Sequence, residues 1–166
     1  MDAQPLIIHA HAFATLAMTG LIWFVQIVHY PLFARAAESG ERAWIGYERA
    51  HQTRTTVVVM PLMLTELATA AWLALNRPDG VDAGLLLGGL ALLGVVWAAT
   101  FFVAVPLHHR LSRGFDTRTH RALVLTNWIR TAAWTARGVI ALAVLEQSVL
   151  KQAILEQALL EQAATA

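Results

Sequence analysis

Four long apolar stretches alternate with polar stretches along the chain, and this pattern is the strongest structural signal in the sequence. A helix of about 20 apolar residues crosses the hydrocarbon core of a bilayer, and helices satisfy their own backbone hydrogen bonds there. We therefore predict an all-α fold, a four-helix transmembrane bundle that occupies residues 1–145. Its helices are expected at about residues 6–33, 55–75, 84–107 and 122–145.

The composition supports a membrane protein. Hydrophobic residues make up 57% of the chain and charged residues 14%, whereas soluble domains carry about 25% charged residues. The net charge of +1 offers no basic surface for nucleic acid. The absence of cysteine excludes disulfides, thiolate metal ligands and covalently attached c-type haem. Histidine, aspartate and glutamate remain as candidate metal ligands.

Arginine is distributed unevenly among the predicted loops. Loops 35–54, 76–80 and 108–121 hold four, one and four arginines, and the segment before the first helix holds none. Because arginine gathers on the cytoplasmic side of membrane proteins, we expect a multi-pass protein with loops 35–54 and 108–121 in the cytoplasm and both termini outside. The first apolar segment has no basic flank, so we expect it to be retained rather than cleaved as a signal peptide.

Residues 146–166 form a repetitive tail. Consecutive five-residue units begin at Val144, Val149, Ile154 and Leu159. Their residues favour helix, but each unit advances the helix by about 140° beyond a full turn, so no single apolar stripe results. A coiled coil needs a period of about 3.5 residues. We therefore expect a helical extension, which either associates with a partner or another copy, or is a repeat expansion under little constraint.

The two halves of the chain resemble one another. Trp23 and Pro31 near the end of the first predicted helix correspond to Trp97 and Pro106 near the end of the third, at offsets of 74 (97 − 23) and 75 (106 − 31) residues. Near-constant offsets predict a duplicated helix–basic loop–helix unit. Two such copies would be related by an axis along the membrane normal.

A polar stripe runs along the fourth predicted helix. Asn127, Arg130, Trp134 and Arg137 recur at helical spacing and share one face. Arginines in a transmembrane segment need a polar or acidic partner inside the bundle, and Glu66 is the one carboxylate within another apolar segment. These residues predict either a buried ion pair that fixes helix packing or a polar cavity. In such a cavity, Glu66 and Arg130 are the candidate catalytic residues.

Gln26 and the tryptophans extend this candidate cavity. Gln26 lies one turn before His29 on the same helical face. Four tryptophans are expected to be buried within the helices, namely Trp23, Trp97, Trp128 and Trp134. Such rings either line a ligand pocket or pack the core. The candidate cavity-lining residues are therefore Gln26, Asn127, Trp128, Trp134 and Arg137.

Three histidines from different helix ends are expected near one membrane face. These are His29, His51 and His108, and Glu48 precedes His51 in E-x-x-H spacing. On a helix this spacing places a carboxylate and an imidazole on one face, as carboxylate-bridged metal sites require. The three histidines predict a metal site for iron or copper, with Glu48 or Glu66 as a further ligand, or axial ligation of haem by two of the histidines. The alternative is ordinary interfacial histidines among arginines.

Three short segments of the chain carry a resemblance to known proteins. They are WFVQIVHYPLF at residues 23–33, PLMLTELATA at residues 61–70, and TNWIRT at residues 126–131 with the tryptophan and arginine that follow. Together they resemble the signatures of a family of small, uncharacterised bacterial integral membrane proteins. The resemblance covers residues 6–145. It implies four helices and a bacterial inner membrane, and it supplies no reaction.

Three functions are compatible with these features. The first is a membrane-embedded metal- or haem-dependent redox protein that acts on a hydrophobic small molecule. The second is a non-catalytic membrane subunit or carrier that binds a lipid, quinone or pigment. The third is a proton-coupled transporter that uses Glu66 as its proton carrier.

Overall fold

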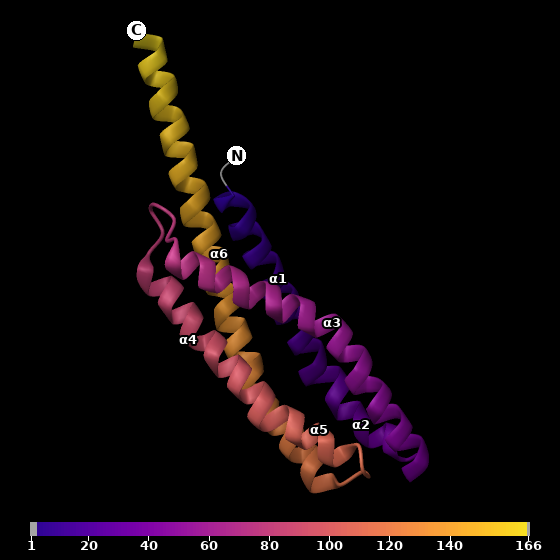
Figure 1. Cartoon of the computed structure of the whole chain (residues 1–166). Helices are drawn as coiled ribbons and strands as arrows, with labels where there is room; N and C mark the ends of the chain where they lie inside the picture. The colour runs from indigo at the N-terminus through magenta and orange to yellow at the C-terminus, as the bar shows by residue number, and fades with distance from the viewer. Residues whose placement is uncertain (1–2, 166) are drawn as a thin grey trace.

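The computed structural model describes residues 3–165, and over that range it contains four long helices and no strand. The helices are α1 (Gln4–Phe24) continued by η1 (Val25–His29) and α2 (Tyr30–Ala37), then α3 (Glu41–Leu75), then α4 (Ala83–Ala99) continued by η2 (Thr100–Ala104) and α5 (Val105–Leu111), and finally α6 (Thr117–Thr165). Figure 1 shows them packed as a bundle, with the start of α1 and the end of α6 at the same end. All four are long and apolar enough to cross a membrane. The predicted all-α, four-helix transmembrane bundle is confirmed.

The helices are longer than expected, and the polar loops are correspondingly shorter. The prediction of a loop over residues 35–54 is wrong, because α3 already begins at Glu41. The cause is amphipathic spacing within this charged segment. Trp44 and Glu48, one turn apart, are fully buried, whereas Arg42 and Arg49 are exposed. The arginines therefore lie on the outer face of α3. The predicted loop at 108–121 shrinks in the same way to residues 112–116.

Glycine and aspartate fix the remaining turns. Gly40 precedes α3 with a φ of 100°, a conformation that favours glycine. Asp82 accepts a hydrogen bond from the Leu85 amide at the start of α4. Asp116 accepts from both the amide and the hydroxyl of Thr119 at the start of α6, at 2.7 and 2.6 Å. These hydrogen bonds satisfy free helix-end donors, and they hold the pKa of the Asp116 carboxyl below its usual value.

Two π-helical turns interrupt the first and third long helices at matching positions. The η1 turn ends two residues before Pro31, and the η2 turn ends two residues before Pro106. A proline has no amide hydrogen and its ring crowds the carbonyl four residues earlier, so a locally widened turn accommodates it without ending the helix. The two turns begin 75 residues apart (100 − 25). The duplication stays a prediction.

The core lies along α1 and α6. Met18, Ile22, Met63 and Trp134 belong to one buried cluster, and a second cluster near the short loops contains Phe33 and Trp44. α1 and α6 approach each other closely at Gly138, where an added Cβ would lie 3.1 Å from the Thr19 hydroxyl oxygen. That hydroxyl donates a hydrogen bond to the Trp134 carbonyl at 2.9 Å. The two backbones can approach this closely because position 138 has no side chain.

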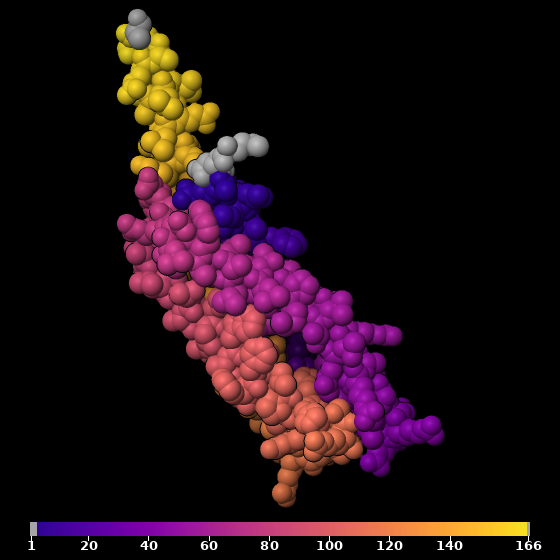
Figure 2. Space-filling model, in the orientation of Figure 1, coloured from indigo at the N-terminus to yellow at the C-terminus, as the bar shows by residue number. Residues whose placement is uncertain are grey.

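The pentad tail continues α6 without a break. From Gln152 onward every described residue is exposed, and Figures 1 and 2 show this yellow segment projecting beyond the other three helices. The predicted helical extension is therefore confirmed. Its first turns still contact the bundle, because the Gln147 side chain accepts a hydrogen bond from the Asp82 amide at 2.9 Å.

The close approach at Gly138 generates a stability prediction. We expect Gly138→Leu to lower the free energy of unfolding by about 1–3 kcal/mol, because extra methylenes must force α1 and α6 apart. Thermal unfolding in detergent would measure the change. Gly88→Leu is the matched control, since a Cβ at Gly88 meets nothing within 4 Å. Equal melting temperatures for the two variants would contradict this account of the contact.

Candidate functional site

A buried ion pair joins α3 to α6. Arg137 Nε donates to Glu66 Oε1 at 2.8 Å, and Trp134 Nε1 donates to the other carboxylate oxygen at 3.1 Å. A second nitrogen of Arg137 donates to the Gly89 carbonyl on α4. Glu66 and Arg137 are 0% and 2% exposed. Both carboxylate oxygens are therefore occupied, and the pair holds three helices together as a packing element.

Arg130 is placed quite differently from Arg137. Its Nη1 donates to Asn127 Oδ1 at 3.2 Å, and its guanidinium lies 5.4 Å from the centre of the Trp134 ring. Its Nε is buried without a hydrogen-bond partner. None of the ion pairs among residues 3–165 involves Arg130. Of the two arginines predicted to pair with Glu66, only Arg137 does so.

Gln26 helps to position Arg130 through Asn127. Asn127 Nδ2 donates to Gln26 Oε1 at 2.9 Å, and Gln26 Nε2 donates to the Val124 carbonyl at 3.2 Å. Gln26 lies in the η1 turn and Asn127 in α6, and both are buried. The predicted grouping of Gln26, Asn127 and Arg130 is present in the structure as a hydrogen-bonded chain.

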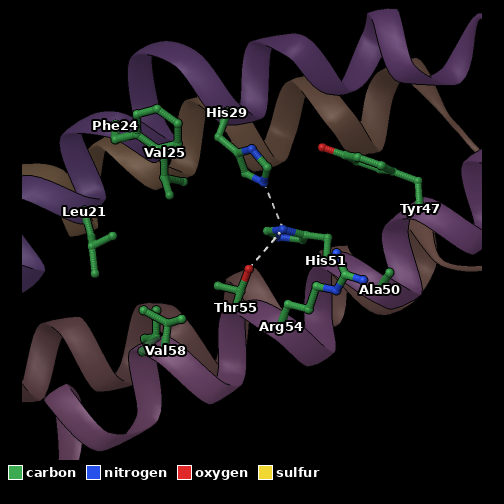
Figure 3. A pocket seen from close by; sticks show the side chains of 11 residues that line it. Leu21, Phe24, Val25, His29, Tyr47, Ala50, His51, Arg54, Thr55 and Val58 are labelled. Carbon is green, nitrogen blue, oxygen red and sulfur yellow. Dashed lines mark hydrogen bonds between the residues drawn. The ribbon is translucent and has the colours of Figure 1, made fainter.

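The three predicted histidines do converge, together with Glu48 and Tyr30. We call these five residues the histidine cluster. His29 Nε2 lies 2.9 Å from His51 Nδ1, and the Thr55 hydroxyl lies 3.0 Å from the same nitrogen. Figure 3 shows the His29 and His51 rings pointing toward each other from η1 and α3. The ring centres of His51 and His108 are 5.2 Å apart.

A hydrogen-bonded chain forms the buried half of the histidine cluster. The Tyr30 hydroxyl lies 2.8 Å from His108 Nε2, and His108 Nδ1 lies 2.6 Å from Glu48 Oε1. Gln52 also donates to Glu48 Oε1, at 3.2 Å. Glu48 Oε2 is buried without a partner. An imidazole held between a phenol and a carboxylate can accept a proton at one nitrogen while donating from the other.

The convergence has the geometry of a hydrogen-bond network. Among residues 3–165, no group of three or more His, Cys, Asp or Glu side chains is arranged to hold a metal ion. The facing nitrogens of His29 and His51 share one hydrogen bond, and both nitrogens of His108 contact protein atoms. The predicted ligands therefore meet, and their ring nitrogens are directed at one another and at side-chain oxygens.

A cavity of about 410 Å³ lies inside the bundle beside this cluster. Its apolar wall comes from α1, α3 and η2, and its polar wall is formed by Tyr30, His51, Gln52, Thr55, His108 and Arg130. We call it the inner cavity. Figure 2 shows the molecule hollowed between α3 and the helix formed by α4, η2 and α5, with atoms of α1 visible in the hollow.

A second cavity of about 400 Å³ is lined by side chains of α1, η1 and α3. This outer cavity, shown in Figure 3, is lined by His29, Tyr47 and Arg54 among apolar side chains of α1 and α3. The two cavities share lining residues, namely Leu21, Val25, His51, Thr55 and Val59. The His51 ring is thus part of the wall between them.

The tryptophans are less buried than predicted. Trp134 is fully buried, but Trp23 and Trp128 are 41% and 43% exposed. They contact each other edge to face on the outer surface, with ring centres 5.7 Å apart. Trp128 lines neither cavity. The prediction of four buried tryptophans is therefore wrong, because helical spacing places Trp128 on the opposite side of α6 from Arg130.

Sequence reasoning missed Tyr30 and Gln52. Tyr30 is one of two tyrosines in the chain and directly follows His29 in an apolar segment, which was the available signal. Gln52 lies beside His51 in the segment predicted as a loop, so its hydrogen bond to Glu48 and its place in the cavity wall could not be inferred without knowing that α3 begins at Glu41.

No protein-family model matches the chain, and no curated protein or solved structure matches it significantly. The resemblance to small bacterial membrane proteins stays a prediction.

The ion pair generates the second prediction. Glu66→Gln leaves the Arg137 charge buried without a counter-charge, and we expect a loss of about 3–5 kcal/mol in the free energy of unfolding. The double variant Glu66→Gln, Arg137→Gln should lose less than the sum of the two single variants. Thermal unfolding in detergent measures both.

An exposed pair provides the control for this prediction. Arg35→Gln disrupts the exposed ion pair with Glu38 and should change stability by about 1 kcal/mol or less. A Glu66→Gln protein as stable as Arg35→Gln would show that the buried pair does not hold the helices together.

Proposed function

We propose that this protein binds a hydrophobic small molecule with an oxygen-containing polar group in the inner cavity, which the molecule enters from the bilayer. The observation that carries the proposal is the composition of the cavity wall. Methionine, leucine, isoleucine and valine side chains surround most of about 410 Å³, and Tyr30, His51, His108 and Arg130 supply hydrogen-bonding groups. Ligand sites typically have such volumes and a few polar groups in an apolar wall.

The polar and apolar parts of the cavity lie at different depths. Met18 and Met63 pack together near the middle of the bundle, whereas Tyr30 and His108 meet closer to the short loops. An amphiphile with one polar end fits this division, with its polar end toward the histidine cluster. Lipids, quinones and lipophilic pigments all have this form.

The geometry favours binding over the other functions predicted from the sequence. For a metal- or haem-dependent redox protein, the histidine nitrogens would have to exchange their present hydrogen bonds for metal bonds. For a proton-coupled transporter, Glu66 would have to leave Arg137 and Trp134. The binding function needs neither rearrangement, because the cavity already exists beside the unbonded Nε of Arg130.

We also propose that the protein lies in a bacterial inner membrane, with residues 38–40 and 112–116 in the cytoplasm and both termini in the periplasm. The arginines that flank these turns support this orientation through the positive-inside rule. Because the chain has no cysteine, labelling of a single introduced cysteine shows on which side of the membrane that position lies. In intact cells, a membrane-impermeant maleimide should label Asp79→Cys and leave Ser39→Cys unlabelled. The reverse pattern would invert the orientation.

A matched pair of substitutions on α3 tests the cavity. Val59 lines both cavities, whereas Val57 is 70% exposed and lines neither. We expect Val59→Phe to weaken binding at least about tenfold, equivalent to about 1.4 kcal/mol, because the larger ring fills ligand space. Val57→Phe should bind as the wild type does.

Native mass spectrometry of the detergent-solubilised protein measures this binding. The probes are dodecanoic acid, dodecan-1-ol and decyl-ubiquinone, each added to the wild type and to both variants. At least one probe should bind in a one-to-one complex that is sensitive to Val59→Phe. If no probe binds, or if both variants bind as the wild type does, the inner cavity is not the binding site.

A further inference from the structure

Arg130 is a buried cation, and no carboxylate among residues 3–165 is bonded to it. It is 8% exposed, its Nε has no hydrogen-bond partner, and it lines the inner cavity. Arg137, seven residues along the same helix, has its carboxylate partner in Glu66. Since a charge removed from water needs a counter-charge and hydrogen bonds, the contrast between the two arginines identifies a position for an external anion.

The same polar wall of the inner cavity can also accept a proton. The Tyr30 hydroxyl lines the cavity and lies 2.8 Å from His108 Nε2, and His108 is bonded in turn to Glu48. With Glu48 ionised, His108 donates from Nδ1 and presents a free lone pair at Nε2 to the phenol. Protonation of His108 would then form a buried imidazolium–carboxylate pair, whose hydrogen bond joins a cationic donor to an anionic acceptor.

We propose that the ligand is a lipophilic acid, which reaches the inner cavity in its neutral form and is held there as the anion against Arg130. This inference rests on the proposed binding function and adds the chemical class of the ligand. The acid gives its proton to the Tyr30 oxygen as the Tyr30 hydroxyl proton passes to His108 Nε2. The products are a carboxylate or other oxyanion beside Arg130 and an imidazolium beside Glu48, so that the proton stays within the site.

Every element around the proton acceptor contributes a titratable or charged group. His29 lies on η1, Tyr30 on α2, Glu48 and His51 on α3, and His120 and Arg130 on α6. His120 is directed at the Tyr30 carbonyl, at 2.7 Å. Glu48 is the one carboxylate hydrogen-bonded within this set, and it is the group that stabilises the imidazolium.

The first test compares an acid with its neutral analogue. Native mass spectrometry with dodecanoic acid and methyl dodecanoate should show at least about tenfold tighter binding of the acid to the wild type. Arg130→Gln should abolish the preference for the acid while the protein still binds the ester. Arg130→Lys should keep part of the preference. Arg54→Gln is the control, because Arg54 lines only the outer cavity and its loss should leave the preference unchanged.

The second test reads the ionisation state of the bound acid. The probe is dodecanoic acid with ¹³C at its carboxyl carbon, and its chemical shift is followed as the pH is lowered. The shift of the bound acid should remain that of the carboxylate until the pH is at least about one unit below the titration midpoint of the same acid in protein-free detergent. His108→Gln keeps a hydrogen-bonding side chain but cannot accept the proton. It should move the bound midpoint back toward the protein-free value.

The outcomes separate this inference from the proposed function. Equal binding of acid and ester, with both sensitive to Val59→Phe, would overturn the acidic ligand while the binding function stands. A bound acid that titrates as it does without protein would also overturn it. If the wild type binds neither probe, the binding function itself fails. The acid–ester comparison in the wild type requires no variant to fold, so the result does not depend on the stability of Arg130→Gln.

Discussion

Two arginines on one face of α6 must be accommodated inside an apolar bundle, and the rest of the structure depends on how each is satisfied. Arg137 is neutralised by Glu66 and also bonds the backbone of α4 at Gly89, so one side chain fixes three helices. Such a pair offsets its own desolvation only when its hydrogen bonds are nearly complete. The Trp134 indole completes the carboxylate side, which explains why this tryptophan is fully buried.

Arg130 sits two turns earlier, and its contacts are the Asn127 amide, the Tyr30 hydroxyl and the Trp134 ring. This asymmetry links packing to function. The helices are held firmly at the level of Glu66, and toward the short loops α3 lines two cavities. The polar groups that face this space come from η1, α2, α3, α5 and α6. A site with contributions from so many elements can recognise a ligand that no single segment would bind.

The π-helical turns contribute to the same arrangement. The η1 turn contains both Gln26 and His29, which bond to different elements, Asn127 on α6 and His51 on α3. A regular helix would place these two side chains nearly one above the other, three residues apart. The wider turn redistributes their directions. A proline two residues after the turn therefore shapes the site without contacting it.

The sequence by itself determined the fold class and the residues that required partners. Four apolar stretches specify four helices, and buried arginines demand a carboxylate. Only the tertiary structure decided which arginine pairs with Glu66. Both arginines lie at a depth in the bundle from which they could reach Glu66, so the choice depends on how α6 is rotated about its axis. It also decided that residues 41–54 form a helix, which carries Glu48 into the core and Gln52 to the wall of the inner cavity, and that Trp128 faces outward. These outcomes depend on how neighbouring helices pack, and that information is distributed over residues far apart in the chain.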